Sequence, residues 1–435
     1  MNDRAITFAV EQTQASREPV GPFGGARHLA GDALGQALID ARGRTWALVQ
    51  DLTPAQWLPP IQPGVNPIAW ELAHLAWFAE FWVLRGPHQF TIGGLANAQH
   101  APHFAGPDAH LDSARLPHQA RWTTPMPNVD GLKTMLNDQL EACLAALKDI
   151  DASLLGATGA AKLDDALYFH RLALFHEDMH AEALCWLRDS LGYAAPPGIA
   201  IPVCEQRQTL SVRGAEVLLG SDACSAGFAF DNERPGKHVQ LQDFEIDSNP
   251  VSALDFAEFV NSGGYGRAQF WPADAGRWRS QANTSYPSHW RPGPRGDWQV
   301  RWFDQWVALQ PGVPAMHLNV FEAEAFCLWA NRRLPTAAQW EHAAQSLTTG
   351  QSELTGRVEF NWGNSVWEWT ADAFAPYPGF SAGPYKQYSQ PWFGDHRELR
   401  GGAFATHPRM HHPHYRNFFL PDRSDVFTGF RTAAL

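Results

Sequence analysis

The chain has 435 residues, of which 45% are apolar and 18% charged, with 19 Trp and a formal charge of −12. This composition excludes a disordered chain, and the length allows two or three domains with their own cores. The negative charge argues against a nucleic-acid partner or an anionic membrane surface and favours small-molecule substrates. No stretch approaches the roughly 18 apolar residues of a membrane span. Five scattered Cys residues without C-x-x-C spacing fit reduced thiols, so we expect a cytoplasmic protein.

The first half of the chain predicts a bundle of helices. Residues 1–31 carry no clear periodicity and predict a partly ordered leader, without the apolar core of a signal peptide. Apolar residues at helical spacing then predict four helices, over residues 32–52, 66–86, 129–150 and 167–191. The Gly-, Pro- and His-rich residues 88–127 form a long connection between the second and third helices. This pattern indicates a four-helix bundle over residues 32–193, and such bundles commonly hold metal sites.

The texture changes after a linker that we place at residues 194–208. In residues 209–435, short strand-like runs such as Thr209–Val212 alternate with Gly, Pro, Asn and Asp turns. Asn319–Arg332 predicts a helix, and a second one begins near Pro335. The second half is therefore predicted to be an irregular α+β domain.

The fourth predicted helix carries His176 and His180, four residues apart. At roughly 100° per residue their imidazoles lie about 40° apart on one face, which suits two ligands of one metal ion. Asp178 and Glu182 lie about 160° away from His180, so a further ligand would come from another helix. Two alternatives remain open. The segment matches the H-E-x-x-H pattern of zinc proteases, and two histidines can also simply pack inside a helix bundle.

A third ligand is expected from the second helix. His74 lies among Trp70, Leu75 and Trp77, so it should face a dry interior. Glu71, about 60° round that helix, is the rival ligand and would give the two-His-one-carboxylate set of non-haem iron oxygenases. Either set leaves coordination positions open, which is typical of a catalytic metal.

Long motifs carry a resemblance to a known family. The run N-P-I-A-W-E-L-A-H-L-A-W-F-A-E-F-W around His74, together with H-E-D-M-H-A-E, resembles the DinB-like domain of the EgtB family of sulfoxide synthases. The second half resembles the formylglycine-generating-enzyme (FGE) fold, a C-type-lectin-like domain. The matching segments are residues 230–235, 333–341, 364–370, 400–404 and 429–431. The resemblance implies a DinB-like four-helix bundle followed by an FGE-type α+β domain, and it covers all but the leader.

The resemblance also implies a reaction. In that family three histidines hold iron(II), which would here be His74, His176 and His180, with O2 as co-substrate. Hercynine, N-trimethyl histidine, would be the acceptor, and the imidazole C2 would be joined to the chalcogen of a donor. The metal supplies the oxidant and holds both partners within reach. Formylglycine generation itself is excluded, because Ala405–Arg416 lacks the reactive cysteine pair.

Two C-terminal segments resemble parts of the family's substrate site. Pro384–Ser389 resembles its tyrosine segment, which implies Tyr385 as the general acid and Tyr388 as a substrate contact. The alternative is a pair of surface tyrosines in a loop. The segment Y-R-N-F-F resembles the part that contacts the hercynine carboxylate and trimethylammonium group. It implies substrate binding by Arg416, Asn417, Phe418 and Phe419.

Departures from the family pattern bear on the donor. Some members place an acidic residue where Phe419 stands, and paired arginines where this chain offers His118 and Arg121. The less charged site resembles the selenoneine synthase branch of the family, whose donor is a selenosugar, 1-seleno-β-D-glucose. The alternatives are an ergothioneine-pathway sulfoxide synthase that uses γ-glutamylcysteine or cysteine, and a non-catalytic binding protein. The intact histidine trio argues against the latter.

Overall fold

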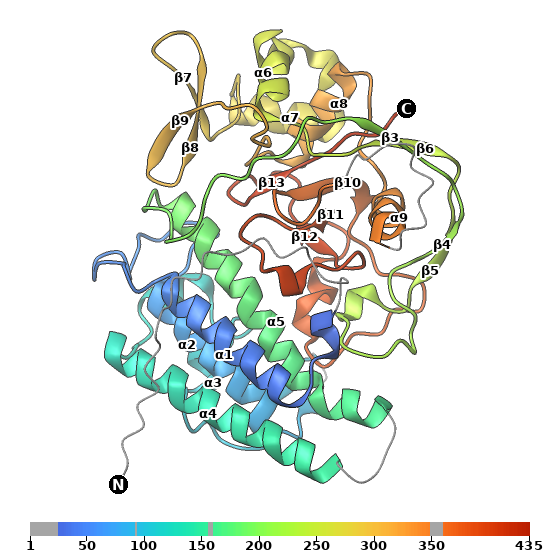
Figure 1. Cartoon of the computed structure of the whole chain (residues 1–435). Coiled ribbons are helices and arrows are strands. Elements are labelled where there is room, and N and C mark those ends of the chain that lie inside the picture. The colour runs from blue at the N-terminus through green and yellow to red at the C-terminus, as the bar shows by residue number, and fades with distance from the viewer. Residues whose placement is uncertain (1–24, 92–93, 155–159, 349–359) are drawn as a thin grey trace.

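The computed structural model describes residues 25–91, 94–154, 160–348 and 360–435, and it consists of a helical domain followed by an α+β domain (Figure 1). This confirms the predicted fold class. The leader expected at residues 1–31 falls mostly outside the described residues. Its last part forms a short 3-10 turn, η1 (Gly25–His28), directly before the first helix.

Four long helices build the first domain: α1 (Gly31–Ala47), α2 (Ile68–Ala79), α4 (Val129–Leu154) and α5 (Ala160–Ser190). All residues of α2 except Ala69 are buried, because α2 is apolar on every side and lies at the centre of the bundle. It continues as one π-helical segment, η2 (Glu80–Leu84). Helix α5 ends at the predicted place, before Gly192 in the left-handed conformation, φ +65°.

The long connection after η2 folds over α2 in short pieces, namely β1 (Gln89–Phe90), β2 (Ala96–Asn97), α3 (Asp108–Leu111) and η3 (His118–Trp122). Asp108 attaches this connection to α2 and to the residue after η2, because its carboxylate accepts hydrogen bonds from Trp77 at 2.8 Å and from Arg85 at 2.7 Å. This attachment brings the backbone carbonyl of Leu111 against the middle of α2.

The second domain is built from small sheets. Strand β3 (Thr209–Val212) pairs with β6 (Phe244–Asp247), and β4 (Glu216–Leu219) pairs with β5 (Lys237–Gln240). A three-stranded sheet consists of β7 (Trp290–Pro292), β8 (Trp298–Trp302) and β9 (Gln305–Ala308). The central sheet has the order β12-β11-β10-β13, with β10 (Trp367–Ala373), β11 (Arg397–Gly401), β12 (Asn417–Phe419) and β13 (Thr428–Gly429).

Helices and 3-10 turns connect these strands. The helices are α6 (Ala253–Asn261), α7 (Ala273–Ala282), α8 (Val320–Trp329) and α9 (Ala337–Thr348), and the turns are η4 (Asp231–Glu233), η5 (Gly264–Gly266), η6 (Ala268–Phe270), η7 (Lys386–Tyr388), η8 (Gln390–Trp392) and η9 (Pro408–Met410). The predicted helix at Asn319 begins there because Asn319 and Glu322 form a reciprocal capping box. The sequence did not predict α6 and α7.

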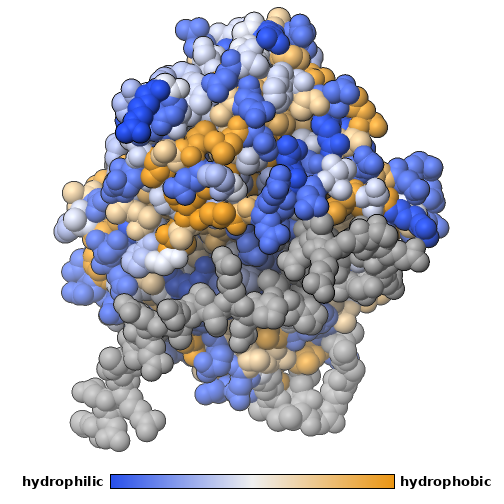
Figure 2. All heavy atoms as spheres, turned by 45° about the horizontal axis from the view of Figure 1, so that its top comes forward, coloured by the Kyte–Doolittle hydropathy of each residue, from blue (hydrophilic) through white to orange (hydrophobic). Residues whose placement is uncertain are grey.

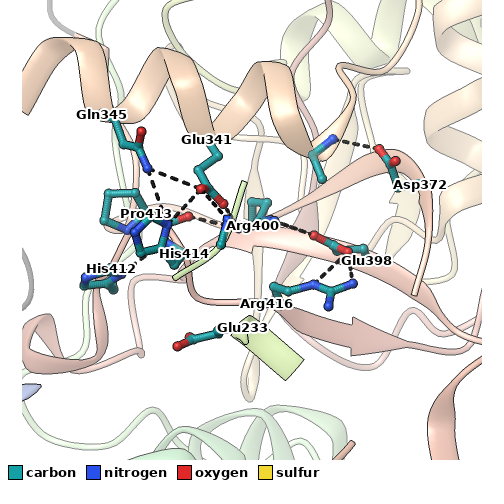
Figure 3. A network of polar contacts seen from close by, with 12 residues as sticks. Glu233, Glu341, Gln345, Asp372, Glu398, Arg400, His412, Pro413, His414 and Arg416 are labelled. Carbon is teal, nitrogen blue, oxygen red and sulfur yellow. Dashed lines mark hydrogen bonds and ion pairs between the residues drawn. The ribbon is translucent and has the colours of Figure 1, made fainter. Parts of the chain in front are cut away.

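Buried ion pairs hold the core of the second domain together (Figure 3). Glu398 on β11 accepts from Arg400 and from Arg416, each at 2.7 Å, and Arg400 also pairs with Glu341 of α9 at 2.7 Å. All four side chains are buried. Removing one partner would leave an uncompensated buried charge, so this network fixes the relative position of α9, β11 and the segment that carries Arg416.

Helix α5 lies between the rest of the bundle and the second domain (Figure 1). On the side of α5 that faces the second domain, the buried Glu182 accepts hydrogen bonds from Trp367 Nε1 and Thr406 Oγ1, both at 2.6 Å. Asp178 pairs with Arg409 Nε of the second domain at 2.7 Å. These carboxylates therefore point away from the His176/His180 face, as the helical period predicts, and they join the two domains.

The surface of the second domain mixes apolar and polar side chains. Figure 2 shows the apolar residues in several groups separated by polar ones. Exposed large apolar side chains include Leu254 of α6 and Leu328 of α8. Within the described residues, no helix combines the length and the apolar character that crossing a membrane requires.

Candidate metal centre and substrate site

Three histidines meet between α2 and α5. His74, His176 and His180 each offer one ring nitrogen, and these nitrogens lie within 4.8 Å of one another. The ring centroid of His74 is 5.3 Å from that of His176 and 5.1 Å from that of His180. The ring plane of His74 is tilted by 58° and 53° against these two rings, respectively. Tilted rings at this spacing can direct three lone pairs to one point, which is what a single metal ion requires.

The ring of His74 is oriented by a hydrogen bond of its Nδ1, the nitrogen that faces away from the cluster. Its Nδ1 lies 2.7 Å from the carbonyl oxygen of Leu111, so Nδ1–H donates and Nε2 keeps a free lone pair. Trp70 stacks on the ring at 4.9 Å and 8°. Burial lowers the pKa of His74 to about 3, so the imidazole is neutral at pH 7, as a metal ligand must be.

His176 is as deeply buried as His74. Its ring stacks on Phe78, with centroids 3.5 Å apart and planes 2° from parallel. Burial, and after it the neighbouring His180, lowers the pKa of His176 far below its ordinary value. The apolar wall formed by Phe78 therefore keeps a second neutral imidazole at the cluster.

Glu71, the rival third ligand in the sequence analysis, binds His180. Its Oε2 lies 2.6 Å from Nδ1 of His180, and its Oε1 accepts from Asn66 Nδ2 at 2.5 Å. Burial raises the pKa of Glu71, but His180, His74 and Asn66 together outweigh burial and bring the pKa to about 2. Glu71 thus binds Nδ1 of His180, the ring nitrogen that faces away from the cluster. It does not point at the position of the metal, as a two-His-one-carboxylate set would require. A carboxylate that orients an imidazole in this way is typical of metal sites.

We expect Glu71→Gln to weaken iron(II) binding by about 10- to 100-fold, the usual effect of losing such an orienting carboxylate. The amide is a weaker acceptor for His180 Nδ1–H and can turn its NH2 group toward the ring instead. Anaerobic titration with iron(II), followed by a competing chelator, measures the affinity. Glu177→Gln is the matched control, since it removes a buried carboxylate on α5 away from the cluster. Equal weakening in both variants would contradict a specific role for Glu71.

Glu177, the acid of the H-E-x-x-H match, faces away from the cluster. Its two carboxylate oxygens bind Arg42 of α1, with Nε at 2.7 Å and NH2 at 3.1 Å. A zinc protease needs this glutamate as a general base next to the metal. The geometry therefore does not support the protease interpretation.

Tyr385 reaches the cluster from the second domain. Its ring stands edge-on to Phe78 at 5.0 Å and lies 6.3 Å from the ring of His176. Burial raises the pKa of the Tyr385 hydroxyl, so it remains protonated at neutral pH. Tyr388 lies one ring further away, stacked on Phe230 at 4.5 Å and hydrogen-bonded to Tyr415.

The four residues expected to bind substrate around β12 divide into two groups. Arg416 lies in the core, where its guanidinium donates to Glu398 and to the carbonyl of Asn232 at 2.5 Å, and Phe418 stacks on the buried Phe374 at 4.1 Å. The structure does not bring these two to the histidine cluster. Asn417 and Phe419 point to the opposite side of the strand, because alternate residues face opposite ways.

Phe419 lies at the domain interface under an arginine that the sequence analysis missed. The Arg423 guanidinium is 4.7 Å from the centre of the Phe419 ring and 4.9 Å from that of Trp186 on α5. Its charge is paired with Asp425 at 2.9 Å. No local pattern marks Arg423, because its aromatic partners come from two domains.

Arg121 and His118 lie on η3, next to the start of α2. Arg121 donates to Asn66 Oδ1 at 2.7 Å and covers the Trp70 ring at 4.2 Å. Arg121 therefore supports both the Asn66–Glu71–His180 chain and the Trp70 stack on His74. His118 is bound by its Nε2 to the carbonyl of Val65 at 2.8 Å. Asn66 was predicted only as the start of a helix, and its contact with Arg121 was not predicted from the sequence.

Models of two protein families match the chain. The DinB superfamily matches residues 37–184, and the sulfatase-modifying factor enzyme 1-like domain matches residues 200–365 and 359–434. The hercynine oxygenase of Mycolicibacterium thermoresistibile is 30% identical, with 92% of this chain and 94% of the relative covered. That of Mycobacterium tuberculosis is 29% identical over 91% and 97%. The formylglycine-generating enzyme of Streptomyces coelicolor is 27% identical over 55% and 93%, respectively.

Proposed function

Because the chain belongs to the family of the hercynine oxygenases, the EgtB-like family, we propose that it is an iron(II)- and O2-dependent enzyme acting on hercynine. The reaction joins a chalcogen atom of a second substrate to the imidazole C2. Two hercynine oxygenases match this chain over 92% and 91% of its length. The observation that carries the proposal is the convergence of His74, His176 and His180.

The donor set fits iron(II). Three imidazoles, a ligand type of intermediate softness, suit a first-row divalent ion, and three ligands leave positions for substrates. Two of the rings are held through Nδ1, His74 by Leu111 and His180 by Glu71, which leaves Nε2 free. When bound, the iron would supply the oxidising chemistry with O2.

The chain's own residues provide the proton and the substrate site. Tyr385 holds its hydroxyl proton close to the cluster, which is the position of a general acid. We assign the binding of hercynine and its co-substrate to Asn417, Phe419, Tyr388, Arg121 and His118. Aromatic faces among them suit the trimethylammonium group, because the ring quadrupole attracts a cation that cannot donate hydrogen bonds.

We propose further that the donor is the selenosugar 1-seleno-β-D-glucose, which makes the enzyme a selenoneine synthase. γ-Glutamylcysteine brings two carboxylates and an ammonium into the site, and unpaired charges are costly there. Phe419 cannot pair an ammonium, and the adjacent Arg423 is already paired with Asp425. A sugar needs hydrogen bonds and a flat apolar wall, which these aromatic residues offer.

With hercynine, iron(II) and O2, we expect the seleno-glucose to exceed γ-glutamylcysteine and cysteine at least tenfold in kcat/KM, about 1.4 kcal/mol of transition-state binding. Product mass spectrometry with the donors in competition measures this ratio. The variant Phe419→Asp, which restores a carboxylate for the ammonium, should shift the ratio toward γ-glutamylcysteine. Equal or better turnover of γ-glutamylcysteine by the wild-type protein would instead indicate a sulfoxide synthase with a thiol donor, the second candidate that the relatives support.

A further inference from the structure

A second group of metal-ligating side chains lies at the far end of α5. Asp189, the penultimate residue of the helix, meets His289 and His317 of the second domain, and their ligating atoms lie within 4.8 Å of one another. Asp189 and His317 are completely buried, and His289 is 9% exposed. This end of α5 points toward β7, β8 and β9 (Figure 1). It is nine residues beyond His180, about 13 Å along the helix axis.

The spacing within this group is too long for hydrogen bonds. Oδ2 of Asp189 is 3.6 Å from Nε2 of His289 and 3.6 Å from Nε2 of His317, whereas N–H···O bonds measure about 2.7–3.2 Å. Nε2 of the buried His317 has no hydrogen-bond partner among the described residues. Two ligands of one tetrahedral zinc ion stand roughly 3.3 Å apart, which is close to the observed spacing.

Two of the other polar atoms, on Asp189 and His289, contact groups outside the cluster. Oδ1 of Asp189 accepts from the backbone N–H of Phe303 at 2.7 Å. Nδ1 of His289 lies 3.1 Å from Ser288 Oγ, and the backbone of Ser424 faces the ring of His317. Such outer partners orient the ligands in metal sites.

The geometry points to a second site, for a divalent cation of the zinc class, held by Asp189, His289 and His317. Two imidazoles and one carboxylate suit Zn²⁺, with the fourth position left to water. The ligands come from both domains, so the ion would tie α5 to the second domain. Since α5 also carries His176 and His180, the ion would restrict the motion of the helix that holds two ligands of the first cluster.

Arg301 competes for this position. Its Nη2 is 3.0 Å from His289 Nε2 and 3.5 Å from Asp189 Oδ2. The guanidinium thus supplies the positive charge at this position when no ion is bound. The rings of His289 and His317 are stacked at 3.9 Å and 9°. Binding an ion requires Arg301, whose side chain is 27% exposed, to turn toward solvent and the rings to tilt until their lone pairs converge. Arg301 should therefore weaken the affinity.

The test counts bound zinc in the full-length protein. The variant His74→Ala/His176→Ala removes the first cluster, and we expect it to retain one equivalent of Zn²⁺ after titration and gel filtration, measured by elemental analysis. Adding His317→Asn or His289→Gln should abolish this binding. Asn tolerates the left-handed backbone of His317, φ +59°, and His289→Gln serves if the first variant does not fold. Circular dichroism reports the fold.

Arg301→Gln gives the opposite expectation. Without the competing guanidinium, zinc should bind at least tenfold more tightly, and zinc should raise the melting temperature of this variant more than that of the wild type. A structural ion pair between Arg301 and Asp189 predicts only lower stability, with no gain in zinc affinity. Two results would overturn the second site: no stoichiometric zinc in the first-cluster variant even with Arg301→Gln, or zinc binding that survives the replacement of both His289 and His317.

Discussion

Replacing His74, His176 or His180 with Ala is expected to remove iron(II) from the protein and to abolish oxidative turnover. Each substitution deletes one of three converging nitrogens, and in the His74 and His176 variants Glu71 cannot take its place because its carboxylate remains bound to Nδ1 of His180. The loss of affinity should exceed the roughly 100-fold upper limit for an orienting partner. Wild-type protein purified without oxygen should hold about one iron(II) at this cluster.

Elemental analysis of anaerobically reconstituted protein measures the occupancy, and product formation from hercynine measures the turnover. His88→Ala is the matched control, since His88 is another histidine of the bundle whose Nε2 binds the carbonyl of Phe81 at 2.7 Å, outside the cluster. It should keep its iron. Full occupancy in His74→Ala together with loss in Glu71→Ala would show that the carboxylate, and not His74, is the third ligand. Stoichiometric zinc with peptide hydrolysis would return the protein to the protease class.

Removing the Tyr385 hydroxyl should cut carbon–chalcogen bond formation by 10²–10⁴-fold, the typical contribution of a general acid, or about 3–5 kcal/mol. Fold and iron content should be unchanged, because the Tyr385 ring, which packs edge-on against Phe78, remains in Tyr385→Phe. The raised pKa of Tyr385 means that the wild-type hydroxyl holds its proton throughout the neutral range. Loss of this proton source should leave donor oxidation without coupling as a side reaction.

Single-turnover assays that follow both coupled product and oxidised donor separate these outcomes. Tyr388→Phe is the control, because it removes an equivalent hydroxyl that is bound to Tyr415, one ring further from the cluster. We expect a smaller loss there, seen mainly in KM. Wild-type coupling by Tyr385→Phe would exclude this residue from proton transfer.

Local signals accounted for most of the elements predicted correctly. Helix α5 stops before Gly192, and α8 begins at the Asn319 cap, because caps depend on a few adjacent residues. The helices α6 and α7 were missed, although α6 carries a local signal: its N-cap Ser252 and its buried Phe256, Phe259 and Val260 at helical spacing. α7 is short and rich in polar residues, with Ala275 as its buried residue, so its own periodicity does not mark it and its stability depends on packing.

The sequence by itself determined the order of the two domains and the placement of His176 and His180 on one face of a helix, since both follow from local periodicity. Only the tertiary structure decided which α2 residue turns toward that face. His74 and Glu71 lie about 60° apart on α2, so the helical pattern allows either. The Leu111 carbonyl, 37 residues from His74, and His180, 109 residues from Glu71, settled their orientations. Likewise, Arg416 is drawn into the core by Glu398, 18 residues earlier in the chain. Such contacts join segments that are distant in sequence, and their geometry depends on how the whole chain packs.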